Sequence, residues 1–113
     1  MPNITPLNDY PQPYGSRMTI IANYAGPANY QAGGEVLNAS QFGWGALDRV
    51  EGGASWNAAN NTQLYVVRAY YPGGTSKSGN NVNLLWYYTA NSVQVANATN
   101  LAGETARIQM TGG

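Results

Sequence analysis

The stretches LYVVRAYY (residues 64–71) and VNLLWYY (residues 82–88) decide the fold of this chain. Both are rich in β-branched and aromatic residues, which favour strands. In the second stretch every second residue is apolar, so one face of the strand is apolar and carries Leu84 and Trp86. A Pro-Gly-Gly segment stops the first stretch, and a polar loop leads to the second. These patterns predict a long hairpin with Leu84 and Trp86 in the core.

Further strands lie on both sides of this hairpin. Apolar and polar residues alternate in residues 17–24, 93–96 and 105–111, and a shorter strand is predicted at residues 46–51. Several short strands at regular spacing, without a convincing helix, are typical of a sandwich or a barrel. We therefore predict an all-β fold, with a single small β-sandwich or barrel over residues 17–113.

Turn signals separate these strands. Gly33 and Gly34 are predicted turn formers, because glycine supplies the positive φ that tight turns need. Asn38 is a candidate N-cap for a single helical turn that ends at Gly43. Residues 54–61 are predicted to form a loop.

Residues 1–16 differ in composition from the rest of the chain. Four prolines lie in this segment, and proline disfavours both helices and ladder pairing. The segment is therefore predicted to be an extended N-terminal arm, separate from the domain at residues 17–113. Leu7, Tyr10 and Tyr14 are its candidate contacts with a neighbouring chain, and a disordered tail is the alternative.

The composition argues against several classes of function. The chain has no histidine and no cysteine, and its 113 residues include only five acidic and five basic side chains. A pair of carboxylates is then the only catalytic option, and no pair is favoured by its spacing, so we expect neither an enzyme nor a cofactor or metal site. Nucleic acid is not an expected partner, because the basic residues are scattered singly. A membrane is not expected either, because no apolar run approaches about 18 residues.

Aromatic residues are the most abundant recognition groups of the chain. Nine tyrosines and three tryptophans exceed what one small core absorbs, and exposed tyrosine is typical of interfaces. Together with a net charge of zero, this favours a chain that assembles with copies of itself or with another protein. A carbohydrate-binding module or receptor-binding tip is an alternative, with Trp44, Trp56 or the Tyr70/Tyr71 pair stacking on sugars. A second alternative is a purely structural role, in which the aromatic residues form cross-strand pairs within a two-layer sandwich.

Two segments resemble a known family. The first is NYQAGGEVL (residues 29–37), which continues to Phe42-Gly43, and the second is VQVANATNL (residues 93–101), which continues to Thr105-Ala106-Arg107-Ile108. In their order and spacing, over roughly residues 17–112, they are similar to small virion proteins of tailed bacteriophages, of the capsid decoration (cement) type. Gln94 and Ala98 stand where that pattern usually has Glu and Gly.

This resemblance implies a structural virion protein on the capsid surface, assembled in the host cytoplasm. It implies the major capsid protein as partner and a homo-oligomer, with a trimer favoured. A position in the tail or in the head–tail connector is an alternative that the resemblance leaves open.

Overall fold

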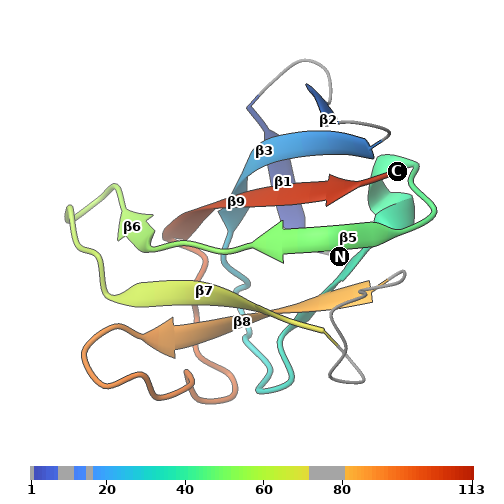
Figure 1. Ribbon diagram of the computed structural model, residues 1–113. Coiled ribbons are helices and arrows are strands. Elements are labelled where there is room, and N and C mark those ends of the chain that lie inside the picture. The colour runs from blue at the N-terminus through green and yellow to red at the C-terminus, as the bar shows by residue number, and fades with distance from the viewer. Residues whose placement is uncertain (1, 8–11, 15–16, 72–80) are drawn as a thin grey trace.

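A computed structural model describes residues 2–7, 12–14, 17–71 and 81–113. Within these residues the chain is all-β, because every regular element except one short 3-10 helix is a strand. The strands form two antiparallel sheets, which lie as two layers in Figure 1. The all-β prediction is therefore confirmed, with the layers of a sandwich.

The larger sheet, sheet A, is built around two long central strands. These are β3 (Arg17–Ala25) and β9 (Glu104–Gly112), which pair antiparallel along almost their whole length. Each has two short strands on its outer side. The short strands are β1 (Asn3–Pro6) and β2 (Gln12–Tyr14) beside β3, and β5 (Leu47–Glu51) and β6 (Ser55–Asn57) beside β9.

The smaller sheet, sheet B, contains the hairpin predicted from the sequence. Its strands are β4 (Glu35–Asn38), β7 (Tyr65–Tyr70) and β8 (Asn81–Tyr88), in the order β4-β8-β7. β7 and β8 pair over six positions, from Tyr65 opposite Tyr88 to Tyr70 opposite Asn83. β8 is therefore the central strand of this layer.

The two sheets join where the chain passes from β5 to β6. Ala54 forms a β-bridge with Val66, and the Val67 N–H donates to the Gly53 carbonyl oxygen at 2.9 Å. At Gly52 a Cβ atom would lie 2.0 Å from the Val67 carbonyl oxygen. Glycine is thus required for the backbones to approach this closely.

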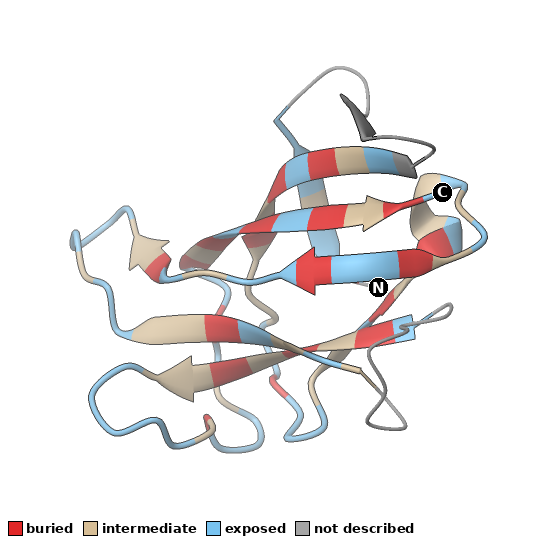
Figure 2. Cartoon of the chain, viewed as in Figure 1, coloured by how far each residue is buried: buried red, intermediate tan, exposed pale blue. Residues whose placement is uncertain are grey.

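The core lies between the two layers and follows the alternation of the strands. Figure 2 shows buried positions alternating with exposed or partly exposed ones along β9, and the same alternation holds in β3 and β8. Its largest side chains are fully buried, and they include Trp86 and Leu84 as predicted. They come from both sheets and from the loops, and are Trp86, Tyr24, Tyr30, Leu37, Leu47, Leu84, Leu101, Ile108, Met110, Val67, Val82 and Val95.

The predicted helical turn is present as a 3-10 helix, η1 (Ala39–Phe42). Its N-cap is Asn38, whose side-chain oxygen accepts from the Ser40 N–H at 2.8 Å. Gly43 ends it at φ 74°, in the left-handed region that favours glycine. The capping pattern therefore predicted this element correctly.

The expectation that proline keeps the N-terminal segment out of a ladder is wrong for β1 and β2. Pro6 lies opposite Ala22, and the next residue, Leu7, donates its N–H to the Ile21 carbonyl oxygen at 2.8 Å. Because hydrogen-bonded and non-bonded pairs alternate in an antiparallel ladder, the Pro6 nitrogen faces away from β3. On an edge strand no donor is needed there. The boundary between an arm at residues 1–16 and the domain stays a prediction.

Two further expectations differ from the structure. Residues 55–57, predicted as loop, form β6 of sheet A, because Ser55 pairs with Ala106 of β9 and its side chain is fully buried. Residues 93–96, predicted as a strand, form only a single bridge, between Gln94 and Tyr87.

Candidate interaction surfaces

The two segments that carry the family resemblance lie against each other. We call residues 26–34 and 93–101 the paired loops. Tyr30 binds the second loop with both backbone groups: its N–H donates to the Thr99 oxygen at 3.0 Å, and its oxygen accepts from the Ala98 N–H at 2.7 Å. The Leu101 N–H donates to the Pro27 oxygen at 2.8 Å, and the Ala32 N–H to the Asn97 Oδ1 at 2.6 Å. Segments far apart in sequence thus form one unit beside sheet B.

The predicted turn formers have different roles within this unit. The Gly34 N–H donates to the Gln31 oxygen at 2.8 Å and closes the turn that contains Gly33. Gly34 has a φ of +82°, and a Cβ there would lie 2.6 Å from the Leu84 oxygen. At Gly33, by contrast, an added Cβ atom would lie in open space. The strict requirement for glycine is therefore at Gly34.

A buried polar network connects the paired loops to the core. The Trp86 indole N–H donates to the Tyr24 hydroxyl at 3.2 Å, and that hydroxyl donates to the Glu35 carboxylate. The Tyr30 hydroxyl accepts from the backbone N–H of Trp86 at 3.1 Å and from the Gln94 side-chain amide at 2.9 Å. Every one of these buried hydroxyls is hydrogen-bonded, as a stable core requires.

Burial gives Tyr24 unusual acid–base behaviour. Desolvation raises its pKa well above the ordinary tyrosine value, and its hydrogen bond to the negatively charged Glu35 raises it further. Its hydrogen bond with Trp86 acts in the opposite direction and is smaller than those two effects. Tyr24 is therefore a neutral donor that fixes the position of the Glu35 carboxylate.

The carboxylates of the described residues do not converge on a common site. Glu104 is buried and accepts from the Asn57 amide at 2.7 Å and from the Ser55 hydroxyl at 3.4 Å. Glu35 lies on sheet B, and Glu51 forms an exposed ion pair with Arg49 on β5. Over the described residues, no group of three or more acidic, histidine or cysteine side chains is placed to hold a metal ion. The part of the chain that the structure describes also has no helix long and apolar enough to cross a membrane.

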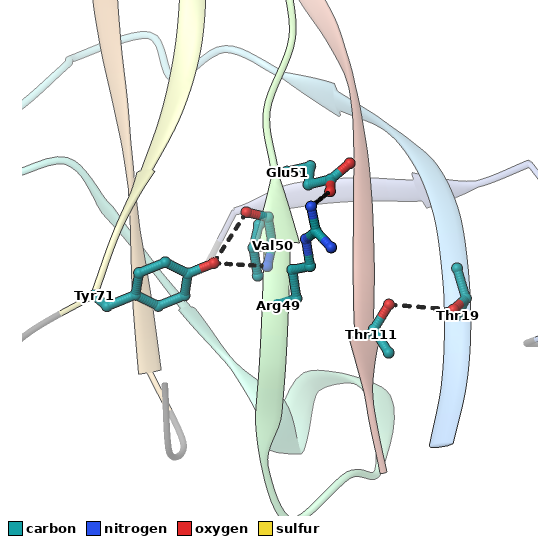
Figure 3. Close-up of polar contacts among 6 residues, drawn as sticks. All are labelled: Thr19, Arg49, Val50, Glu51, Tyr71 and Thr111. Carbon is teal, nitrogen blue, oxygen red and sulfur yellow. Dashed lines mark hydrogen bonds and ion pairs between the residues drawn. The ribbon is translucent and has the colours of Figure 1, made fainter. Parts of the chain in front are cut away.

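The outer face of sheet A is mainly polar. Thr19 and Thr111 share a hydroxyl hydrogen bond of 3.2 Å across β3 and β9, and the Arg49–Glu51 pair lies next to them on β5 (Figure 3). At the other end the Arg107 guanidinium lies 5.8 Å from the centre of the Trp56 ring. Besides Trp56, the exposed Ile21 on β3 and Leu7 opposite it are apolar side chains on this face.

The outer face of sheet B is mainly apolar and aromatic. The strand register places nine side chains on it, of which Val36, Val66, Tyr70, Leu85 and Tyr87 are apolar or aromatic and Asn38, Arg68, Asn81 and Asn83 are polar. Val36 is 50% exposed and Tyr70 is 53% exposed. The guanidinium of Arg68 lies 4.8 Å from the centre of the Tyr87 ring. Apolar side chains on both faces of a sheet are typical of sheets that are covered on both faces, so another surface is expected to cover this outer face.

This face could have been found in the sequence. Residues 82–88 carry apolar side chains at both alternating sets of positions, with Leu85 and Tyr87 opposite Leu84 and Trp86. The regular pleat sends Tyr87 outward and Tyr88 inward, where its ring lies 5.4 Å from that of Tyr65. The second apolar set was the signal for an exposed apolar face.

The predicted contacts of the N-terminal segment are described in part. Leu7 is 47% exposed at the end of β1. Tyr14 lies on β2 opposite Arg17, and the structure describes its backbone only. Tyr10 lies outside the described residues. Of the three, Leu7 is thus the one whose side chain is seen at the surface.

The aromatic residues considered for sugar stacking do not form a common platform. Trp44 packs against Phe42 at 5.4 Å and against the core, while Trp56 lies on the outer face of sheet A beneath Arg107. Tyr70 lies on sheet B, and the hydroxyl of its neighbour Tyr71 binds the backbone of β5.

Comparison with protein-family models, curated proteins and solved structures found no match to this chain.

Proposed function

We propose that this chain is a structural virion protein of a tailed bacteriophage, a capsid decoration subunit that binds the major capsid protein and stabilises the head. Its place is the capsid surface, and it acts as a homo-oligomer, with a trimer favoured. Binding a second protein across a shell stabilises the assembled form by mass action, so no catalytic chemistry is needed. We expect no enzymatic activity.

The paired loops carry this proposal. The resemblance to decoration proteins depends on the order and spacing of residues 29–37 and 93–101, which stand far apart in the sequence. In the fold they are joined through Tyr30, Ala98 and Thr99 by hydrogen bonds of 2.7 and 3.0 Å. The resemblance therefore concerns one structural unit of the protein, which supports it more strongly than two separate short matches would.

The chemistry of the surface supports the same function. Charged side chains are few, the described carboxylates are engaged within the chain or scattered, and apolar side chains remain exposed on both sheets. These are properties of a protein that binds other proteins through area and shape. In this proposal Leu7, Tyr10 and Tyr14 of the N-terminal segment contact the major capsid protein.

Stoichiometry tests the proposed function directly. The protein is quantified against the major capsid protein by mass spectrometry in purified particles of the phage that encodes it. A copy number comparable with that of the major capsid protein is expected for a decoration subunit. A number that fits one small ring would instead place the chain in the tail or connector, and absence from the particles would overturn the proposal.

A further inference from the structure

We propose that the outer face of sheet B is a second surface that docks on the capsid shell, besides the N-terminal segment, against an apolar patch that carries a carboxylate facing Arg68. This inference rests on the proposed function for the identity of the partner. The face itself follows from the register of β4, β8 and β7, which sets Val36, Tyr70, Leu85 and Tyr87 on one side of the sheet.

The exposed apolar side chains are the first argument. Val36 and Tyr70 lie at the two ends of one row across the sheet, on either side of Asn83. Both are about half exposed, and Leu85 and Tyr87 are partly exposed in the next two rows of the same face. Exposed apolar side chains that gather on one face of a sheet mark an interaction site more often than isolated apolar residues do.

Glycine keeps this face open at its β4 edge. The register that pairs Glu35 with Leu84 sets Gly34 beside Leu85. A Cβ on Gly34 would lie 3.1 Å from the Leu85 Cγ. The missing side chain at Gly34 therefore leaves room for the Leu85 side chain at this edge of the face.

The charge of the face identifies the partner's chemistry. Arg68 is exposed and stacks on Tyr87, and it has no ion pair within the part of the chain that the structure describes. Covering the guanidinium costs free energy unless an opposite charge is supplied. The face has no acidic side chain of its own, so the partner supplies the carboxylate. Tyrosine and arginine are also the side chains that most often dominate binding energy at interfaces.

A second copy of the chain is a poorer occupant than a different protein. Among the described acidic residues, Glu51 is paired with Arg49, Glu35 accepts from Tyr24, and Glu104 is buried. Asp48 also has an interaction partner. A second copy would thus bring another Arg68 without an available carboxylate from these residues, whereas a shell protein with an exposed carboxylate satisfies the charge.

The test uses the full-length protein and purified shells assembled without it. Three variants are compared with the original protein by co-sedimentation: a double variant Val36→Thr with Tyr70→Thr, a single variant Arg68→Gln, and the control Ala58→Ser in the exposed turn after β6. Threonine is a good strand former, so the fold is preserved, which circular dichroism and thermal unfolding check. We expect both sheet B variants to lose about tenfold or more in affinity, and the control to bind like the unchanged protein.

The outcomes of this experiment distinguish the docking face from the proposed function and from self-association. Unchanged affinity of the folded sheet B variants, with normal binding of the original protein, overturns the docking face and leaves the proposed function standing. Failure of the original protein to bind shells overturns the proposed function and this inference with it. If sedimentation equilibrium shows an oligomer that the double variant dissociates, the face is occupied by a second copy and the proposal of a shell partner is wrong.

Discussion

The hydroxyl of Tyr71 binds both backbone groups of Val50: it accepts from the N–H at 3.1 Å and donates to the carbonyl oxygen at 3.2 Å. Tyr71 follows β7, whereas Val50 lies on β5 at the edge of sheet A (Figure 3). The backbone groups of Val50 that face away from β9 are therefore satisfied by one side chain, which links the two sheets without a further strand.

Removing this hydroxyl should destabilise the protein. Tyr71→Phe leaves a donor and an acceptor on nearly buried Val50 without their partner, so the free energy of unfolding should fall by about 1–3 kcal/mol. The matched control is Tyr70→Phe, whose ring is 53% exposed on sheet B and whose substitution should change stability by less than about 0.5 kcal/mol. Urea denaturation followed by tryptophan fluorescence measures both. Equal stabilities of the two variants would show that the link contributes nothing.

The two glycines of the turn before β4 should respond differently to alanine. Gly34→Ala forces a side chain into a φ of +82° and against the Leu84 oxygen, so we expect a loss of about 1–3 kcal/mol in the free energy of unfolding. Gly33→Ala meets open space, so its stability should stay within about 0.5 kcal/mol of the original. Thermal and chemical denaturation of the pair give the answer. A comparable loss in both would contradict the assignment of the strained position to Gly34.

Stability should fall at alkaline pH because of Tyr24. Burial and the hydrogen bond to Glu35 raise its pKa above the ordinary value of 10.0, so the folded state keeps the proton that the unfolded state releases. The contribution of Tyr24 is complete below pH 10.0 and is lost as the pH rises above it. One such proton changes the free energy of unfolding by about 1.4 kcal/mol per pH unit.

Tyr24→Phe removes that part of the pH dependence. Denaturation between about pH 8 and about pH 11 should therefore give a shallower loss of stability in the variant than in the original protein. Some loss should remain, because desolvation, with Tyr88 and Glu104 nearby, also raises the pKa of Tyr65. The same slope in both proteins would refute the role of Tyr24.

The N-terminal segment should matter for stability as well as for binding. Removing residues 1–7 deletes β1, whose Ile4 packs against the core, and the Pro2 oxygen that accepts from the Gln41 amide at 2.9 Å. We expect the free energy of unfolding to fall by about 2 kcal/mol or more, in the range of large-to-small core substitutions.

Leu7→Ser separates the two roles of this segment. Because Leu7 is 47% exposed, its substitution should leave stability within about 0.5 kcal/mol while weakening co-sedimentation with shells. Unchanged shell binding in this variant would remove Leu7 from the proposed contacts. Unchanged stability of the truncated chain would show that β1 is a dispensable edge.

Most of the strands could be predicted because alternation along the chain reports burial on one face. That signal located β3, β8 and β9, whose inward side chains are apolar at every second position. It could not locate β6, since Ser55 is buried by its pairing with Ala106 and not by its own hydrophobicity. The sequence also could not show that Pro6 takes part in a ladder. Pro6 can do so because its nitrogen lies on the side of β1 that has no neighbouring strand.

The candidate surfaces were less predictable than the strands. The Tyr24–Trp86 contact joins residues from different sheets, and no local pattern indicates which tyrosine is buried. The apolar outer face of sheet B was visible as two apolar sets in residues 82–88, but its extent depends on the pairing of β8 with β4 and β7. Long-range register is set by packing of the whole domain, so single-strand patterns cannot supply it.

The short outer strands of sheet A have a consequence for behaviour at high concentration. Over the described residues, β1, β2, β5 and β6 are each five residues long or shorter, and each outer side of the sheet is divided between two of them. Fibrils grow when long, flat, unpaired strand edges recruit further chains. An edge broken into short pieces recruits poorly, so sheet A resists growth into cross-β aggregates when many copies crowd together.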